Sequence, residues 1–93
     1  MYTINYWPAA DDALSELEKD PAKAEELRAV DRTLLQLAED PFNPRLGTTM
    51  FMTEPLGGIN ATPTAFNDWY IIWQPSPEPG EIAAVQIVQL HLT

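Results

Sequence analysis

The sequence predicts one α+β domain, residues 1–93, in which a helical hairpin packs on a mainly antiparallel four-stranded sheet. Three observations predict this class. An alternating segment opens the chain, two segments with helical apolar spacing follow it, and aromatic or β-branched segments occupy the second half. The predicted order is therefore β-α-α-β-β-β, and a chain of 93 residues has room for only one such domain.

The first half of the chain contains a strand and two helices. Residues 2–7 carry Tyr or Ile at every second position, which predicts a strand. Residues 10–17 place apolar side chains at helical spacing with acidic residues between them. Asp20 followed by Pro21 is typical of an N-cap and the first position of a helix. A second helix therefore begins there, and the Asp-Pro pair at 40–41 ends it.

The second half is expected to form an antiparallel meander. Residues 48–53 and 69–74 are apolar and rich in strand-forming side chains, and the latter segment reads as a central strand. Residues 54–68 are rich in Pro, Gly, Asn and Thr, which predicts a long loop. Residues 81–92 predict a long final strand that alternates without interruption. Short or moderate connections between these strands favour antiparallel pairing, with the helix pair covering one face.

The charge balance limits the partners of this chain. Fourteen acidic residues stand against five basic ones, and the net charge is −9. Such a chain repels nucleic acid phosphates unless its few cations gather at one site. All five cations lie at or before Arg45, so the second half offers a nucleic acid only neutral donors, aromatic rings and one histidine.

No cofactor and no metal ion is expected. The chain has no cysteine, which excludes disulfides and thiolate ligands and fits a reducing compartment. Its acidic pairs lack a histidine or a carboxylate at ligand spacing, and Gly57-Gly58 lacks the lysine of a phosphate-binding loop. No apolar run approaches the roughly 20 residues of a membrane span, and the N-terminus has no basic start. We therefore expect a cytoplasmic protein without a membrane partner.

Three side chains are candidates for a functional site. His91 has the ordinary pKa that suits proton transfer near neutral pH, although a polar residue at a frayed strand end is the alternative. Arg45 has a planar fork that can hold a phosphate, although a surface arginine paired with a helix carboxylate is the alternative. Tyr70, with Trp69 and Trp73 on the other face of its strand, offers rings for base stacking, and packing in the core is the alternative.

Four segments resemble the RelE/ParE superfamily of toxins from bacterial type II toxin–antitoxin modules. Residues 1–10 are similar to the family's opening strand, and residues 34–41 to the end of its helical hairpin. Residues 68–73 read Asp-Trp-Tyr-Ile-Ile-Trp, where the family reads Asp-Tyr-Arg-Ile-Ile-Tyr. Residues 81–91 resemble its final valine-rich strand, which ends in Gly-His-Arg in the family. The resemblance covers nearly the whole chain.

The resemblance implies a toxin that acts on mRNA at the ribosome or on gyrase and is neutralised by a cognate antitoxin. An active enzyme would be a metal-independent endoribonuclease, an mRNA interferase, with His91, Arg45 and Tyr70 as its site. Tyr70 stands where the family has arginine, and Leu92 stands where the family ends on arginine. These departures favour, as the alternative, an acidic interaction protein that kept the scaffold without catalysis or that mimics nucleic acid. Association of two copies of the chain into a homodimer is a further possibility.

Overall fold

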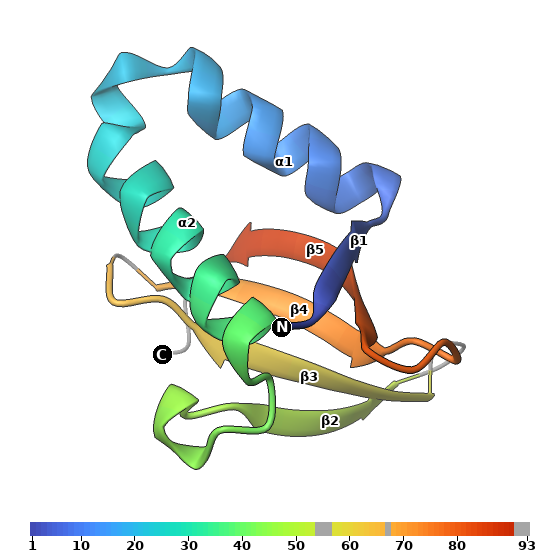
Figure 1. Ribbon diagram of the computed structural model, residues 1–93. Helices are drawn as coiled ribbons and strands as arrows, with labels where there is room; N and C mark the ends of the chain where they lie inside the picture. The colour runs from blue at the N-terminus through green and yellow to red at the C-terminus, as the bar shows by residue number, and fades with distance from the viewer. Residues whose placement is uncertain (54–56, 67, 91–93) are drawn as a thin grey trace.

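The structure is a computed structural model that describes residues 1–53, 57–66 and 68–90 (Figure 1). It shows two helices packed on one face of a five-stranded mixed sheet, so the predicted α+β class with helices on a sheet is confirmed. The elements in chain order are β1 (Thr3–Tyr6), α1 (Pro8–Lys19), the 3-10 turn η1 (Pro21–Lys23), α2 (Ala24–Glu39), the 3-10 turn η2 (Pro44–Leu46), β2 (Thr49–Thr53), β3 (Gly57–Pro63), β4 (Trp69–Pro75) and β5 (Glu81–Gln89).

The helical hairpin follows the pattern of its sequence. α1 opens on Pro8 at its first position, where a missing N–H costs no helical hydrogen bond. The carboxylate of Asp20 accepts a hydrogen bond from the Ala22 N–H at 3.0 Å, and the first turn after it is 3-10 before α2 begins. α2 ends at an extended Asp40, the conformation favoured before proline. No helix among the described ranges is long and apolar enough to span a membrane.

The sheet has the order β1-β5-β4-β3-β2. α1 packs on β5 and α2 packs on β4. Along β4, Trp69, Ile71 and Trp73 are buried under the helices, whereas Tyr70 and Ile72 are half-buried on the opposite face. The core is completed by apolar side chains of both helices and β5, namely Ala10, Leu17, Val30, Leu34, Leu37, Ile82, Ala84 and Ile87.

The predicted count of four strands and the order β-α-α-β-β-β are wrong. Part of the predicted loop at 54–68 forms β3, which pairs antiparallel with both β2 and β4. Its Gly, Asn and Pro residues have weak strand preference, but pairing on both sides and the burial of Ala61 and Thr62 hold it extended. β1 pairs in parallel with β5, with Thr3 opposite Glu81, so the sheet is mixed.

The final strand is shorter than predicted and is interrupted. β5 ends at Gln89, and residues 91–93 lie outside the described residues. Ile72 pairs with Gln86 but its neighbour Trp73 pairs with Ala84, so β5 contains one extra residue at this point. The bulge turns Ile87 toward the helices, where it is 2% exposed, although uninterrupted alternation from Ala84 would point it away.

Tyr6 ends β1 and has a pKa raised above its ordinary value. Burial disfavours its tyrosinate, and the Asp31 carboxylate adds repulsion. A raised pKa in the folded state contributes stability that is present below the ordinary value of about 10 and is lost as the pH rises through the folded pKa. We therefore expect the free energy of unfolding of Tyr6→Phe to fall less steeply above about pH 10 than that of the native chain.

Urea unfolding at a series of pH values measures this difference. Measurements near pH 7 are the control, because the Tyr6 hydroxyl is neutral there in both the folded and the unfolded chain. Parallel pH profiles for the native chain and Tyr6→Phe would contradict the prediction.

Candidate functional site

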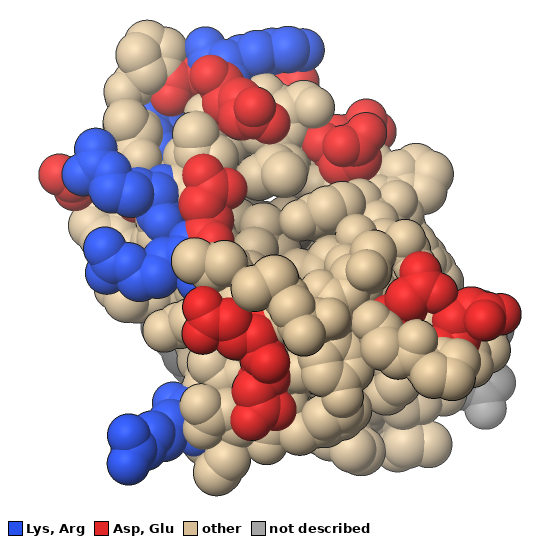
Figure 2. Space-filling model, in the orientation of Figure 1, with Lys and Arg blue, Asp and Glu red and all other residues tan. Residues whose placement is uncertain are grey.

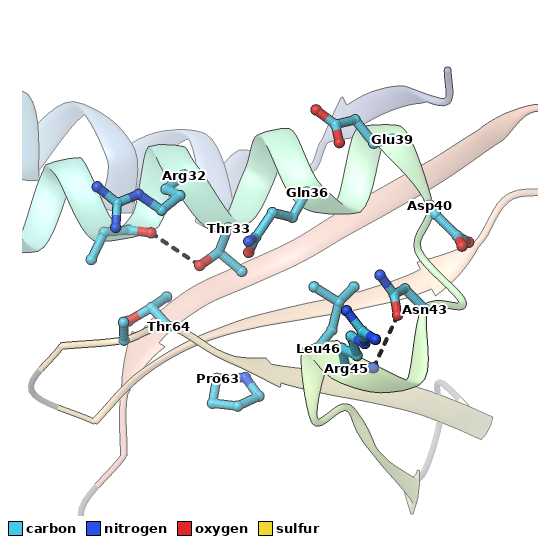
Figure 3. Close-up of a pocket in the computed structure, with 12 residues that line it drawn as sticks. Arg32, Thr33, Gln36, Glu39, Asp40, Asn43, Arg45, Leu46, Pro63 and Thr64 are labelled. Carbon is cyan, nitrogen blue, oxygen red and sulfur yellow. Dashed lines mark hydrogen bonds between the residues drawn. The ribbon is translucent and has the colours of Figure 1, made fainter.

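A polar cleft of about 520 Å³ lies between α2, the turn that leads into β2, and the end of β3 (Figure 3). Gln36 points from α2 into this space, and Arg45 lines it from η2. Glu39 and Asp40, at the end of the same helix, line the cleft as well. The polar and charged side chains that line the cleft are Arg32, Thr33, Gln36, Glu39, Asp40, Asn43, Arg45 and Thr64.

Two local hydrogen bonds, each from a backbone N–H to a side-chain oxygen two residues earlier, turn the chain back beside α2. After the helix ends, the Asp40 carboxylate accepts a hydrogen bond from the Phe42 N–H at 3.1 Å. The Asn43 side-chain oxygen then accepts one from the Arg45 N–H at 3.0 Å. In such turns the Asp or Asn side chain takes the place of a backbone carbonyl as the hydrogen-bond acceptor, and the chain direction reverses. Gly47 ends η2 at φ 72°, a conformation that favours glycine, so the local sequence itself fixes where Arg45 projects.

The arginines gather on one side of this acidic molecule. Arg32 and Arg45 line the cleft, while Arg28 and Arg32 line an adjoining hollow beside Phe66. Figure 2 shows Lys and Arg side chains along one side of the molecule over α2, with Asp and Glu spread more widely over the visible face. None of the three guanidinium groups forms an ion pair within the described ranges, so the expected pairing of Arg45 with a helix carboxylate is absent there.

The cleft offers two guanidinium groups to an oxyanion, alongside the carboxylates of Glu39 and Asp40. Guanidinium groups bind phosphate or carboxylate oxygens through parallel N–H donors, and nearby amide and hydroxyl groups add neutral donors. With two unpaired guanidinium groups in one concave site, charge stabilisation is the chemistry that this arrangement offers. Within the described ranges, three or more His, Asp or Glu side chains nowhere gather as they do around a metal ion.

The structure places the three predicted site residues differently. Arg45 is exposed and lines the cleft. Tyr70 is half-buried in β4 and lines another hollow, which shares with the cleft only the wall formed by residues 63–65. His91 lies outside the described residues. The described part of the chain therefore does not bring Arg45 and Tyr70 into one site.

Two tryptophans near Tyr70 belong to the interior. Trp73 is 1% exposed, and its indole N–H donates to the Thr62 hydroxyl at 2.9 Å. The Trp69 indole N–H donates to the Glu26 carboxylate, and the Lys23 ammonium lies 5.8 Å from the centre of the Trp69 ring. Packing in the core, the alternative to base stacking, is thus confirmed for both tryptophans.

The sequence contains a signal for Arg28 and Arg32 that candidates considered one at a time do not reveal. Arg28 and Arg32 are four residues apart on a helix, so they occupy one face. Their proximity to Arg45 depends on the chain reversal after α2. No protein family, curated protein or solved structure matches this chain.

Proposed function

We propose that this chain is the toxin component, or a toxin-like homologue, of a type II toxin–antitoxin module of the RelE/ParE kind. The succession of a strand, a helical hairpin and an antiparallel meander supports the proposal. The observation on which it chiefly depends is a single cleft lined by both Arg32 and Arg45, two of the chain's five cations, which have no ion-pair partners among the described residues. A fold shared by many functions would not suffice without such a site.

The target that best fits this cleft is the phosphate backbone of mRNA at the ribosome. Because the net charge is −9, a polyanion is repelled by most of the surface and is attracted chiefly where the arginines gather. In a metal-independent cleavage, the 2′-oxygen forms a bond to the adjacent phosphorus as the phosphorus–5′-oxygen bond breaks, which leaves a 2′,3′-cyclic phosphate and a 5′-hydroxyl. The 2′-hydroxyl gives up its proton, the departing 5′-oxygen takes one up, and the arginine forks stabilise the charge that develops on the phosphate. His91 is the side chain that we propose for proton transfer. Gyrase is the other target of this kind of protein, and inhibiting it would require only binding.

Inducible expression in a bacterial host tests the proposal. We expect growth arrest on induction and relief of that arrest when the protein encoded by an adjacent reading frame, the cognate antitoxin, is co-expressed. Both proteins would then reside in the cytoplasm, where the targets are. Mapping of RNA ends after induction separates the targets, because new cleavage sites in mRNA indicate an interferase and their absence indicates gyrase. Unhindered growth at high levels of folded protein would contradict the proposal.

A second candidate is a non-catalytic interaction protein that kept the scaffold. One observation favours it: Arg45 and Tyr70 line different hollows, so the described residues do not form a shared catalytic site. On this hypothesis Arg45→Ala and His91→Ala leave every phenotype unchanged while a partner still co-purifies. A partner bound by mimicry of nucleic acid would dissociate as salt is raised, whereas a partner bound by apolar contacts would not.

A further inference from the structure

We propose that two copies of this chain form a symmetric dimer by antiparallel pairing of their β2 strands. Among the residues that the structure describes, β2 is the last strand of the sheet and is bonded to β3 on one side only. Its other side presents backbone N–H and C=O groups with which another strand can pair. Pairing of two β2 strands would join the two five-stranded sheets into one continuous sheet.

The chemistry of β2 is that of an interface strand. Its sequence, Thr-Met-Phe-Met-Thr, has no charged residue and no proline, the devices that usually protect a free edge. The exposed fractions are 69% for Met50, 48% for Phe51 and 79% for Met52. The opposite edge differs, because β1 has only four residues and leads directly into α1 at Pro8. The two edges of the sheet are therefore not equivalent: β2 presents three consecutive large apolar side chains, whereas the β1 edge ends in the less exposed Tyr6 and Trp7, at 40% and 37%.

The order of residues in β2 makes a second copy the best occupant. The five residues form a palindrome, so a two-fold axis through Phe51 sets Phe51 opposite Phe51 and Met50 opposite Met52 of the second copy. Because side chains alternate between faces, the methionines of both copies then share one face and the phenylalanines share the other. Apolar side chains of one copy therefore face apolar side chains of the other at residues 50–52, without any pair of equal charges.

Charge also favours this contact over others between two copies. The net charge is −9, so most surfaces of two molecules repel each other. From Pro41 to Thr53, by contrast, the sequence contains a single charged residue, Arg45. Phe42, which is 61% exposed, lines a hollow with Asn60, the residue opposite Met50 in the sheet, and so extends the apolar surface beside β2.

The size of this surface predicts a weak, reversible dimer. Pairing of five residues with a few flanking side chains belongs to the low end of interface areas, under about 1,200 Å² in total. We expect a dissociation constant on the order of 10 µM. Sedimentation of the native chain at increasing concentration should therefore show monomers converting to dimers and no larger species, since pairing about a two-fold axis occupies the β2 edge of both copies.

Disulfide trapping tests the register. The chain has no cysteine, so Phe51→Cys introduces a single thiol at the proposed axis. Directly opposite residues of antiparallel strands have Cβ atoms about 4.5–5.5 Å apart, close to disulfide geometry. Under mild oxidation we expect rapid cross-linking of Phe51→Cys. The matched control Thr3→Cys, exposed on the other edge strand, should remain largely uncross-linked.

A charge at the axis gives a second, independent measurement. Phe51→Lys sets two equal charges opposite each other and should raise the dissociation constant at least about tenfold, whereas Thr3→Lys should leave it unchanged. Near-ultraviolet circular dichroism of the buried tryptophans reports whether each variant is folded. The proposal is overturned if the native chain stays monomeric throughout, if species larger than dimers accumulate, or if Phe51→Cys cross-links no faster than Thr3→Cys.

Discussion

Replacement of Trp73 with alanine is expected to lower the free energy of unfolding by about 3–5 kcal/mol. Trp73 is 1% exposed in the centre of the sheet, and Phe42 packs edge-on against it with ring centres 6.0 Å apart. Its indole N–H donates to the Thr62 hydroxyl, which is itself 2.7 Å from the Thr48 hydroxyl. The substitution therefore removes a large buried side chain and one member of a polar chain that joins β3, β4 and the segment before β2. Small domains are stable by only about 5–15 kcal/mol, so a substantial loss of folded protein is expected.

Urea unfolding followed by circular dichroism measures this effect. Ile72→Ala, on the half-buried face of the same strand, is the matched control and should cost clearly less, since its surroundings are already partly solvated. Trp73→Phe combined with Thr62→Val separates packing from hydrogen bonding in a double-mutant cycle, where the single loss of a partner for a buried group costs about 1–3 kcal/mol. If Trp73→Ala lowered the free energy of unfolding no more than Ile72→Ala does, the predicted contribution of Trp73 to stability would be refuted.

Joint replacement of Arg32 and Arg45 with alanine is expected to weaken binding of single-stranded RNA by tenfold or more at low salt, on the order of two lost phosphate contacts. The two guanidinium groups line one cleft, and no carboxylate among the described residues pairs with either. Each phosphate contact that is lost should reduce the slope of log affinity against log salt by about 0.7. Both side chains are exposed, so the stability of the chain should change by no more than about 0.5 kcal/mol.

Fluorescence anisotropy with a labelled oligonucleotide over a salt series measures both quantities. Lys19→Ala is the control, because Lys19 lines a hollow at the turn between α1 and α2 rather than the cleft. In the growth assay the joint variant should lose toxicity while Lys19→Ala retains it. An unchanged salt slope in the joint variant would show that the cleft does not contact phosphate and would redirect the proposal toward a protein target.

The positions of the arginines and of Tyr70 on the surface depend on tertiary contacts that spacing along the chain does not encode. Helical spacing places Arg28 and Arg32 on one face of α2, but the two turns after Asp40 are needed to bring Arg45 to the cleft that Arg32 lines. Alternation along β4 was enough to predict that Tyr70 and Trp73 lie on opposite faces of the sheet. By contrast, only the folded sheet shows that Tyr70 lines a different hollow from the cleft that Arg45 lines.

The sequence by itself determined those helices and strands whose regularly spaced apolar side chains face the core. Alternation at β1, helical spacing in α1 and α2, and the aromatic run of β4 each place apolar side chains on one face, so local order is enough to predict them. β3 and the bulge opposite Trp73 were decided by tertiary structure alone. The Gly, Asn and Pro of β3 have little intrinsic strand preference, and only hydrogen bonds to strands on both sides, together with burial of Thr62, make the extended state the stable one.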